Sequence, residues 1–144
     1  MPLSGEERAQ EEWFEAHQKE REAMFANEGF VIGMLQVVSA AAIFGAIAQQ
    51  KEVTALAGKL PLLLFLTTMA VALICSVLAA YWRYWYKTWD AKMRVSEDQE
   101  EALVRKISAG DDLNNMRVSM VIATWATVAG KCELVVSAWV VAYH

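Results

Sequence analysis

Three long apolar runs constrain the fold of this chain more than any other feature of its sequence. Gly29 to Ala48 contains 20 residues without a charge, and Leu60 to Trp82 contains 23. A helix of 20 residues rises about 30 Å, which matches the hydrocarbon thickness of a bilayer. The third run, Val118 to Tyr143, has a similar length but includes Lys131 and Glu133. The pattern predicts an all-α integral membrane protein with three transmembrane helices and helical extensions outside the membrane.

Charged residues lie almost entirely outside these runs. Of the 17 acidic residues, eight fall between Glu6 and Glu28 and seven between Asp90 and Asp112. A water-soluble helical domain instead carries charge along one face of every helix. We therefore predict a cytoplasmic, amphipathic, acidic helix over residues 1–28 and a three-span membrane domain over residues 29–144. The second part includes a cytoplasmic helical hairpin over residues 83–117.

Lysine and arginine residues predict the orientation of the chain. Ten of them lie in residues 1–28 and 83–117, whereas the first loop holds only Lys51 and Lys59. Basic residues that flank membrane spans stay on the cytoplasmic side. We expect a multi-pass protein of a bacterial inner membrane, with the N-terminus and the second connection in the cytoplasm and the first loop and C-terminus outside.

Local signals predict where the helices begin and end. Ser4 and Glu7 have the spacing of a capping box, so a helix should begin at Gly5 and run unbroken into the first span. The segment from Gln49 to Lys59 is predicted to be a short loop.

The second span is expected to continue outside the membrane as a helix, because semi-apolar side chains recur at spacings of three and four as far as Ile107. Gly110 suits the left-handed cap that ends a helix. Asp111 or Asp112 suits the first position of the next helix. These signals predict a hairpin whose turn lies at Gly110.

An aromatic and basic belt follows the second apolar run. It includes Trp82, Arg83, Trp85, Lys87 and Trp89. Such a mixture also occurs where bases stack in single-stranded nucleic-acid sites. Its position directly after 23 apolar residues favours an anchor at the membrane interface, with the lipid bilayer and not nucleic acid as the partner.

Small residues in the spans are candidates for close helix packing. Gly29 with Gly33, and Ala41 with Gly45, have the small-xxx-small spacing that lets helix backbones approach each other, and Gly130 belongs to a similar stripe in the third span. The alternative is that glycine and alanine are simply common in membrane helices.

The two charges in the third span carry the main functional expectation. From the inner end of the run, Lys131 lies about 21 Å and Glu133 about 24 Å along the helix, in the outer half of the bilayer. They are about 200° apart around the helix, so they cannot pair with each other. An ionisable residue at this depth faces a bundle interior or water.

Three arrangements satisfy these charges. They can line an ion or solute path in a ring of subunits, in which Thr124, Thr127 and Ser137 are further lining candidates and Lys131 pairs with Glu133 of a neighbouring copy. Glu133 can instead bond to a polar residue of another span, while Lys131 extends toward the outer headgroups. The polar candidates are Gln36, Ser39, Thr67 and Ser76. In the third arrangement, the span begins near Leu113 and both charges lie closer to the outer headgroups.

Residues for catalysis or metal binding are scarce. The two histidines, His17 and His144, have no cysteine or histidine at metal-ligand spacing, and no phosphate-binding loop is present. Cys75 and Cys132 both lie in spans, where no disulfide is expected. We expect no enzyme activity, no metal and no cofactor.

The span number is similar to that of phage holins, although the strongest basic segment here lies between the second and third spans. The chain also broadly resembles small helical effectors that perforate membranes in bacterial defence systems, and no motif is specific to either group. We expect a homo-oligomer that forms or gates an ion or small-solute path, as a channel, a pore or a membrane-perturbing effector. The alternative is a non-conducting scaffold or anchor subunit whose cytoplasmic helices recruit another protein.

Overall fold

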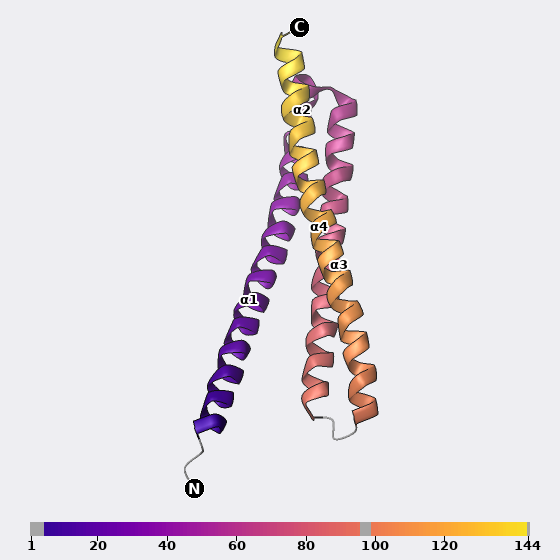
Figure 1. Ribbon diagram of the computed structural model, residues 1–144. Helices are drawn as coiled ribbons and strands as arrows, with labels where there is room; N and C mark the ends of the chain where they lie inside the picture. Colours follow the sequence, from indigo (N-terminus) through magenta and orange to yellow (C-terminus); the bar gives the residue numbers. More distant parts are fainter. Residues whose placement is uncertain (1–4, 96–98, 144) are drawn as a thin grey trace. The chain divides into compact units, whose positions relative to one another are not determined.

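The computed structural model describes residues 5–95 and 99–143, with the side chains of 12, 13, 15–90 and 103–141. This part of the chain is helical throughout apart from the junctions between helices (Figure 1). The helices are α1 (Gly5–Ala48), α2 (Gln50–Ala57), α3 (Lys59–Val95) and α4 (Gln99–Tyr143). The all-α fold predicted from the apolar runs is therefore confirmed.

The chain divides into two compact units, Met1–Val31 and Ile32–His144. In the first unit, most described side chains of α1 are exposed, and the Trp13 and His17 rings stack with their centroids 4.0 Å apart. His17 Nδ1 lies 3.1 Å from the carbonyl oxygen of Trp13. The helix begins at Gly5 and passes unbroken into the first apolar run, as predicted, while the cap expected from Ser4 lies outside the described residues.

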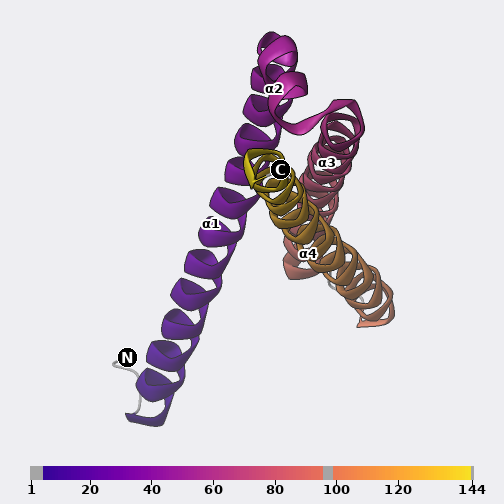
Figure 2. The ribbon, with the colours of Figure 1, turned by 90° about the horizontal axis from the view of Figure 1, so that it is seen from above.

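The segment predicted as a loop after the first run is instead mostly helical. Residues Gln50–Ala57 form α2, because the segment is rich in good helix formers and Ala57 is buried. Gly58 ends this helix with φ 88°, a conformation that side chains other than glycine disfavour, and its N–H donates to the Thr54 carbonyl. Figure 2 shows α2 between the end of α1 and the start of α3.

Helices α3 and α4 form an antiparallel pair along most of their length (Figure 1). The buried positions of α3 alternate at spacings of three and four residues, and buried positions of α4 recur every seven. In α3 they are Leu62, Phe65, Met69, Ala72, Ser76 and Ala79, and in α4 they are Ala109, Met116, Ala123, Thr127 and Gly130. A seven-residue repeat is the spacing of a left-handed coiled-coil seam. The seam is made largely of small side chains.

The register of this pair shows that the predicted turn at Gly110 is wrong. Met116 shares a buried cluster with Ala79, and Gly130 lies against Phe65. Both pairs are centred on the connection between α3 and α4, so the chain reverses there and Gly110 remains inside α4. Asp111 and Asp112 are likewise interior helical residues and not caps. Long-range packing of the seam outweighs the local preference of glycine for a helix end.

The end of α1 that belongs to the second unit packs against α3. Ile32, Ser39 and Ala46 are buried seven residues apart along it. Ala46 joins a cluster with Leu62, Phe65 and Met69 of α3, onto which Leu134 of α4 also packs. Gln36 Nε2 donates to the backbone carbonyl of Ser76 at 3.4 Å. The second unit is thus a bundle of three apolar helical segments with α2 at one end.

Three helices of the described chain are long and apolar enough to cross a bilayer: they extend over Glu15–Ala48, Lys59–Asp90 and Leu103–Val141, and the apolar runs begin within them, at Gly29, Leu60 and Val118. Only 17%, 33% and 17% of their most apolar windows are buried within the chain. A water-soluble bundle would bury these faces, so the large apolar remainder requires lipid or other protein. The chain is a multi-pass membrane protein.

Candidate functional site in the third span

Glu133 and Lys131 lie on opposite flanks of the α4 seam. Glu133 is half-buried, and its Oε2 is enclosed without a hydrogen-bond partner among the described residues. Lys131 is exposed. Because consecutive helical residues are separated by about 100°, the two side chains leave α4 in nearly opposite directions. The protomer therefore leaves the enclosed oxygen of Glu133 without a donor, which carries a desolvation cost.

Three of the four polar residues that were candidate partners for Glu133 make other hydrogen bonds. Thr67 Oγ1 donates to the Leu64 carbonyl at 2.8 Å, and Ser76 Oγ donates to the Leu73 carbonyl at 2.7 Å. Gln36 bonds to the backbone of α3, as described above. Ser39 is fully buried, and its Oγ has no partner among the described residues. None of these hydrogen bonds reaches the Glu133 carboxylate.

The other candidate lining residues divide between the seam and the surface. Thr127 is buried against α3, and its Oγ1 donates to the Ala123 carbonyl at 2.8 Å. Thr124 is exposed and bonds in the same way to the Met120 carbonyl. Ser137 is half-buried on the flank that carries Glu133. Within one protomer, Thr127 is thus a packing residue, whereas Thr124 and Ser137 are open to a neighbouring chain or to lipid.

The glycines of the spans have different surroundings. A Cβ on Gly130 would lie 2.5 Å from Met69 Cε and 2.6 Å from Thr68 Oγ1, so only glycine fits without a shift in α3. A Cβ on Gly33 or Gly45 would meet nothing within 4 Å.

Ala41 and Gly29 were also proposed for helix packing, and no close contact like that of Gly130 is described for them. Ala41 is exposed, and Gly29 is half-buried in the first unit. Close approach through the first span therefore remains a prediction about contacts with another chain.

The aromatic belt on α3 holds its rings against one another. Tyr81 contacts Trp82 and Trp85 edge-to-face, with centroids 5.3 and 6.3 Å apart, and Trp85 lies 6.3 Å from Trp89. Arg83 is half-buried within this belt, while Lys87 is exposed. Such a rigid, amphipathic cluster is typical of residues at a membrane interface.

Asp112 of α4 contacts this belt, which the sequence patterns did not predict. The Trp89 side chain donates a hydrogen bond to the Asp112 carboxylate. Burial raises the pKa of Asp112 above its usual value, the adjacent Asp111 carboxylate raises it further, and the bond from Trp89 opposes both effects. Continuing the seven-residue repeat of α4 before Val118 would have placed Asp112 near this interface.

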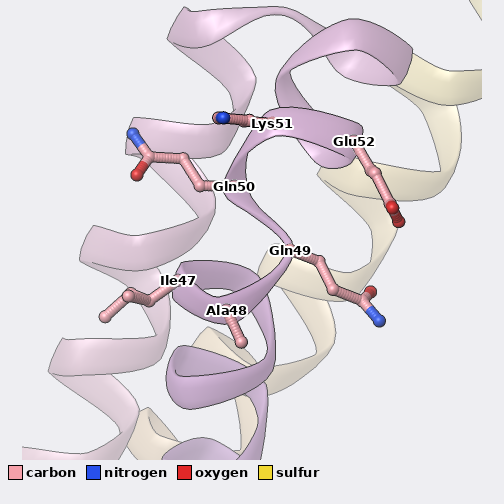
Figure 3. Close-up of a pocket in the computed structure, with 6 residues that line it drawn as sticks. All are labelled: Ile47, Ala48, Gln49, Gln50, Lys51 and Glu52. Atoms are coloured by element: carbon pink, nitrogen blue, oxygen red, sulfur yellow. The ribbon is translucent and has the colours of Figure 1, made fainter.

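A hollow of about 470 Å³ lies at the junction of α1 and α2. Six consecutive residues line it, from Ile47 to Glu52, and Figure 3 shows Gln50 and Lys51 on one side of the chain and Gln49 and Glu52 on the other. It is an open groove beside a single turn of chain and gathers no residues from α3 or α4.

No protein-family model, no curated protein and no solved structure matches this chain.

Proposed function

We propose that this chain assembles into a homo-oligomer in the membrane and forms or gates a path for ions or small solutes. The observation that carries the proposal is the enclosed, unpaired oxygen of Glu133 in a span that also presents Lys131 on its surface. Ionisable groups in a span face water or a charged partner, because the hydrocarbon cannot solvate them. Neither requirement is met within one protomer, so a neighbouring chain or an aqueous lumen must meet it.

The surface of α4 supports assembly from several copies. Three membrane helices are too few to enclose an aqueous conduit, so a lumen requires a ring in which each copy contributes one helix. In this span Thr124 is exposed, and Ser137 and Glu133 are half-buried, so these three polar residues are candidates for contact with such a lumen or with a neighbour. Thr127 is left out of the proposed lining because the seam with α3 buries it.

The direction of the path follows from the distribution of basic residues. Residues 1–28 and 83–117 contain ten lysines and arginines, which places the N-terminus and the α3 to α4 connection in the cytoplasm in this proposal. Glu133 and Lys131 then lie toward the outer end of the path.

Solute flux from liposomes tests the proposal. The purified chain should release a small charged solute, and Glu133→Gln and Lys131→Met should reduce the release while the size of the assembly stays unchanged. Lys51→Met and Glu52→Gln are matched controls, because they make the same chemical changes at exposed positions on α2. A chain that assembles yet passes no solute under any ionic or voltage condition would contradict the proposal.

One observation favours a second candidate function, a non-conducting scaffold that recruits another protein. Leu103, Val104 and Ile107 are 59%, 61% and 61% exposed on the part of α4 that precedes the apolar run. Apolar side chains grouped in this way outside the spans are common where proteins bind one another. Loss of partner capture after Leu103→Ser and Ile107→Ser, with flux unchanged, would separate this role from conduction.

A further inference from the structure

The charges of the third span also indicate how copies of this chain contact each other, an inference that rests on the proposed function. We propose that Lys131 of one copy forms an ion pair with Glu133 of the next copy around a closed ring. This ion pair adds to the proposed function the specific contact that joins neighbouring subunits.

The first step is that Glu133 lacks a hydrogen-bond donor and Lys131 can supply one. The enclosed Oε2 of Glu133 has no donor among the described residues. Lys131 presents an ammonium group on the exposed surface of the same span. In hydrocarbon, each charge alone is costly, while a hydrogen-bonded pair satisfies both groups. A second copy is the partner that supplies the missing donor without any further component.

The second step is depth in the membrane. Lys131 and Glu133 are two residues apart, so their backbones differ by only about 3 Å along the helix axis. The flexible four-carbon stem of lysine spans this difference. Copies that lie side by side at the same depth therefore bring Lys131 of one level with Glu133 of the other.

The third step is the direction of the two side chains. In a two-fold dimer, one surface patch meets its own copy, so both members of the pair would need to lie on that patch. Lys131 and Glu133 instead leave α4 about 200° apart, on opposite flanks of the seam. Each copy can thus offer Glu133 to one neighbour and Lys131 to the other. Such a head-to-tail contact, repeated between copies in one membrane plane, closes into a ring when the rotation from one copy to the next divides a full turn.

The contact leaves the seam between α3 and α4 intact, and it requires the Glu133 carboxylate, whose Oε2 is enclosed within one copy, to turn toward the neighbouring copy. Ala123, Thr127 and Gly130 face α3 and are buried, whereas Lys131 is exposed and Glu133 is half-buried. The pairing between copies therefore does not compete with the pairing of α3 and α4. It adds an ionic contact to whatever apolar area neighbouring copies bury.

Cross-linking in liposomes with a flexible bismaleimide tests the contact, because a lysine and glutamate pair holds its two backbones farther apart than a disulfide can bridge. The background carries Cys75→Ala and Cys132→Ala, and copies with Lys131→Cys are mixed with copies with Glu133→Cys. The mixture should form cross-linked dimers with this reagent, while neither variant alone should do so. A dimer from either variant alone would indicate a two-fold contact and would overturn the ring.

The chain offers a matched control at the same depth. Cys132 lies between the two charged residues in sequence and is exposed on a third face of α4. Copies that keep Cys132 as their only cysteine, mixed with Lys131→Cys copies, should not cross-link. Cross-linking as fast as that of the mixture of Lys131→Cys and Glu133→Cys copies would mean that contacts are random, and would overturn the pair.

Exchanging the charges at positions 131 and 133 gives an independent test in which both positions stay charged. Lys131→Glu alone and Glu133→Lys alone should abolish the oligomer, because each places like charges opposite one another. The double variant restores opposite charges at every contact and should recover it. Equal assembly of all three variants would overturn the ion pair.

The cross-linking and flux experiments distinguish failure of the proposed ion pair from failure of the proposed solute path. Cross-linked rings that pass no solute would remove the proposed path and leave the ion pair. Solute flux without cross-linking between positions 131 and 133 would remove the ion pair and leave the path.

Discussion

At the scale of single residues, side chains on α4 meet very different surroundings within a few turns. Gly130 is enclosed by α3, Lys131 is exposed, and Glu133 keeps an enclosed oxygen without a donor. These differences follow from the narrow seam, because Lys131 lies about 100° to one side of Gly130 around the helix and Glu133 about 60° to the other side. The surroundings of each side chain in this span therefore depend on its position around the helix and not on the composition of the span.

Asp112 carries a pH dependence that can be tested residue by residue. Burial and the Asp111 charge hold its pKa above the usual value of 3.8, so the folded chain binds this proton more tightly than the unfolded chain does. Its contribution favours folding at low pH and is lost as the pH rises from the unfolded value through the folded pKa. Asp112→Asn should therefore raise stability at neutral pH, with a gain that shrinks toward pH 4, about the unfolded value.

Chemical unfolding in detergent at several pH values measures this effect. Asn keeps a carbonyl oxygen that can accept the Trp89 bond, so the variant isolates the charge. Asp111→Asn is the matched control and should have a smaller effect, because it removes only a secondary cause of the shift. A gain from Asp112→Asn that grows as the pH falls would show that the assigned direction is wrong.

At the scale of elements, two glycines of α4 should respond oppositely to the same substitution. Gly110→Ala should stabilise the hairpin by about 0.5–1 kcal/mol, because alanine favours a helix interior and a Cβ there meets nothing within 4 Å. Gly130→Ala should destabilise it by about 1–3 kcal/mol, because the added carbon overlaps Met69 and Thr68 in a packed seam.

Thermal unfolding of the two variants, followed by circular dichroism in the same detergent, checks both signs together. If α4 instead began after Gly110, with that glycine in a left-handed cap, Gly110→Ala would destabilise the chain. A stabilising Gly130→Ala would mean that the helices are farther apart than the seam requires.

The sequence predicted the spans and the unbroken α1, and it missed α2 and the position of the turn. The spans and the unbroken α1 follow from uncharged length and helix propensity, which a sequence shows directly. The position of the turn depends on Gly130 lying against α3, a contact between residues far apart in the chain.

The same limit applies to the candidate site. Thr127 was grouped with Lys131 as a lining candidate on ideal helical spacing, yet the seven-residue seam draws Thr127 inward while Lys131 stays outside. The depth and the opposed directions of Lys131 and Glu133 needed only the helical rise and turn. The enclosed oxygen of Glu133 could be found only from the structure.

At the scale of the whole molecule, the three spans and the basic residues predict that two lysines lie on opposite sides of the membrane. Lys51 lies on α2 and Lys106 on α4, and both side chains are exposed. In a background without Cys75 and Cys132, Lys51→Cys should react with a membrane-impermeant maleimide on intact cells, and Lys106→Cys only after lysis. Labelling of both positions, or only of Lys106→Cys, before lysis would contradict the proposed orientation.

The hairpin of α3 and α4 is longer than a bilayer is thick. The 37 residues of α3 extend about 55 Å at the helical rise, against roughly 30 Å of hydrocarbon. One continuous seam of small side chains joins the two helices from Gly130 to Ala109. We expect its aqueous and membrane portions to move together as one stiff rod, so that a twist or tilt imposed outside the bilayer is carried to the depth predicted for the two charges.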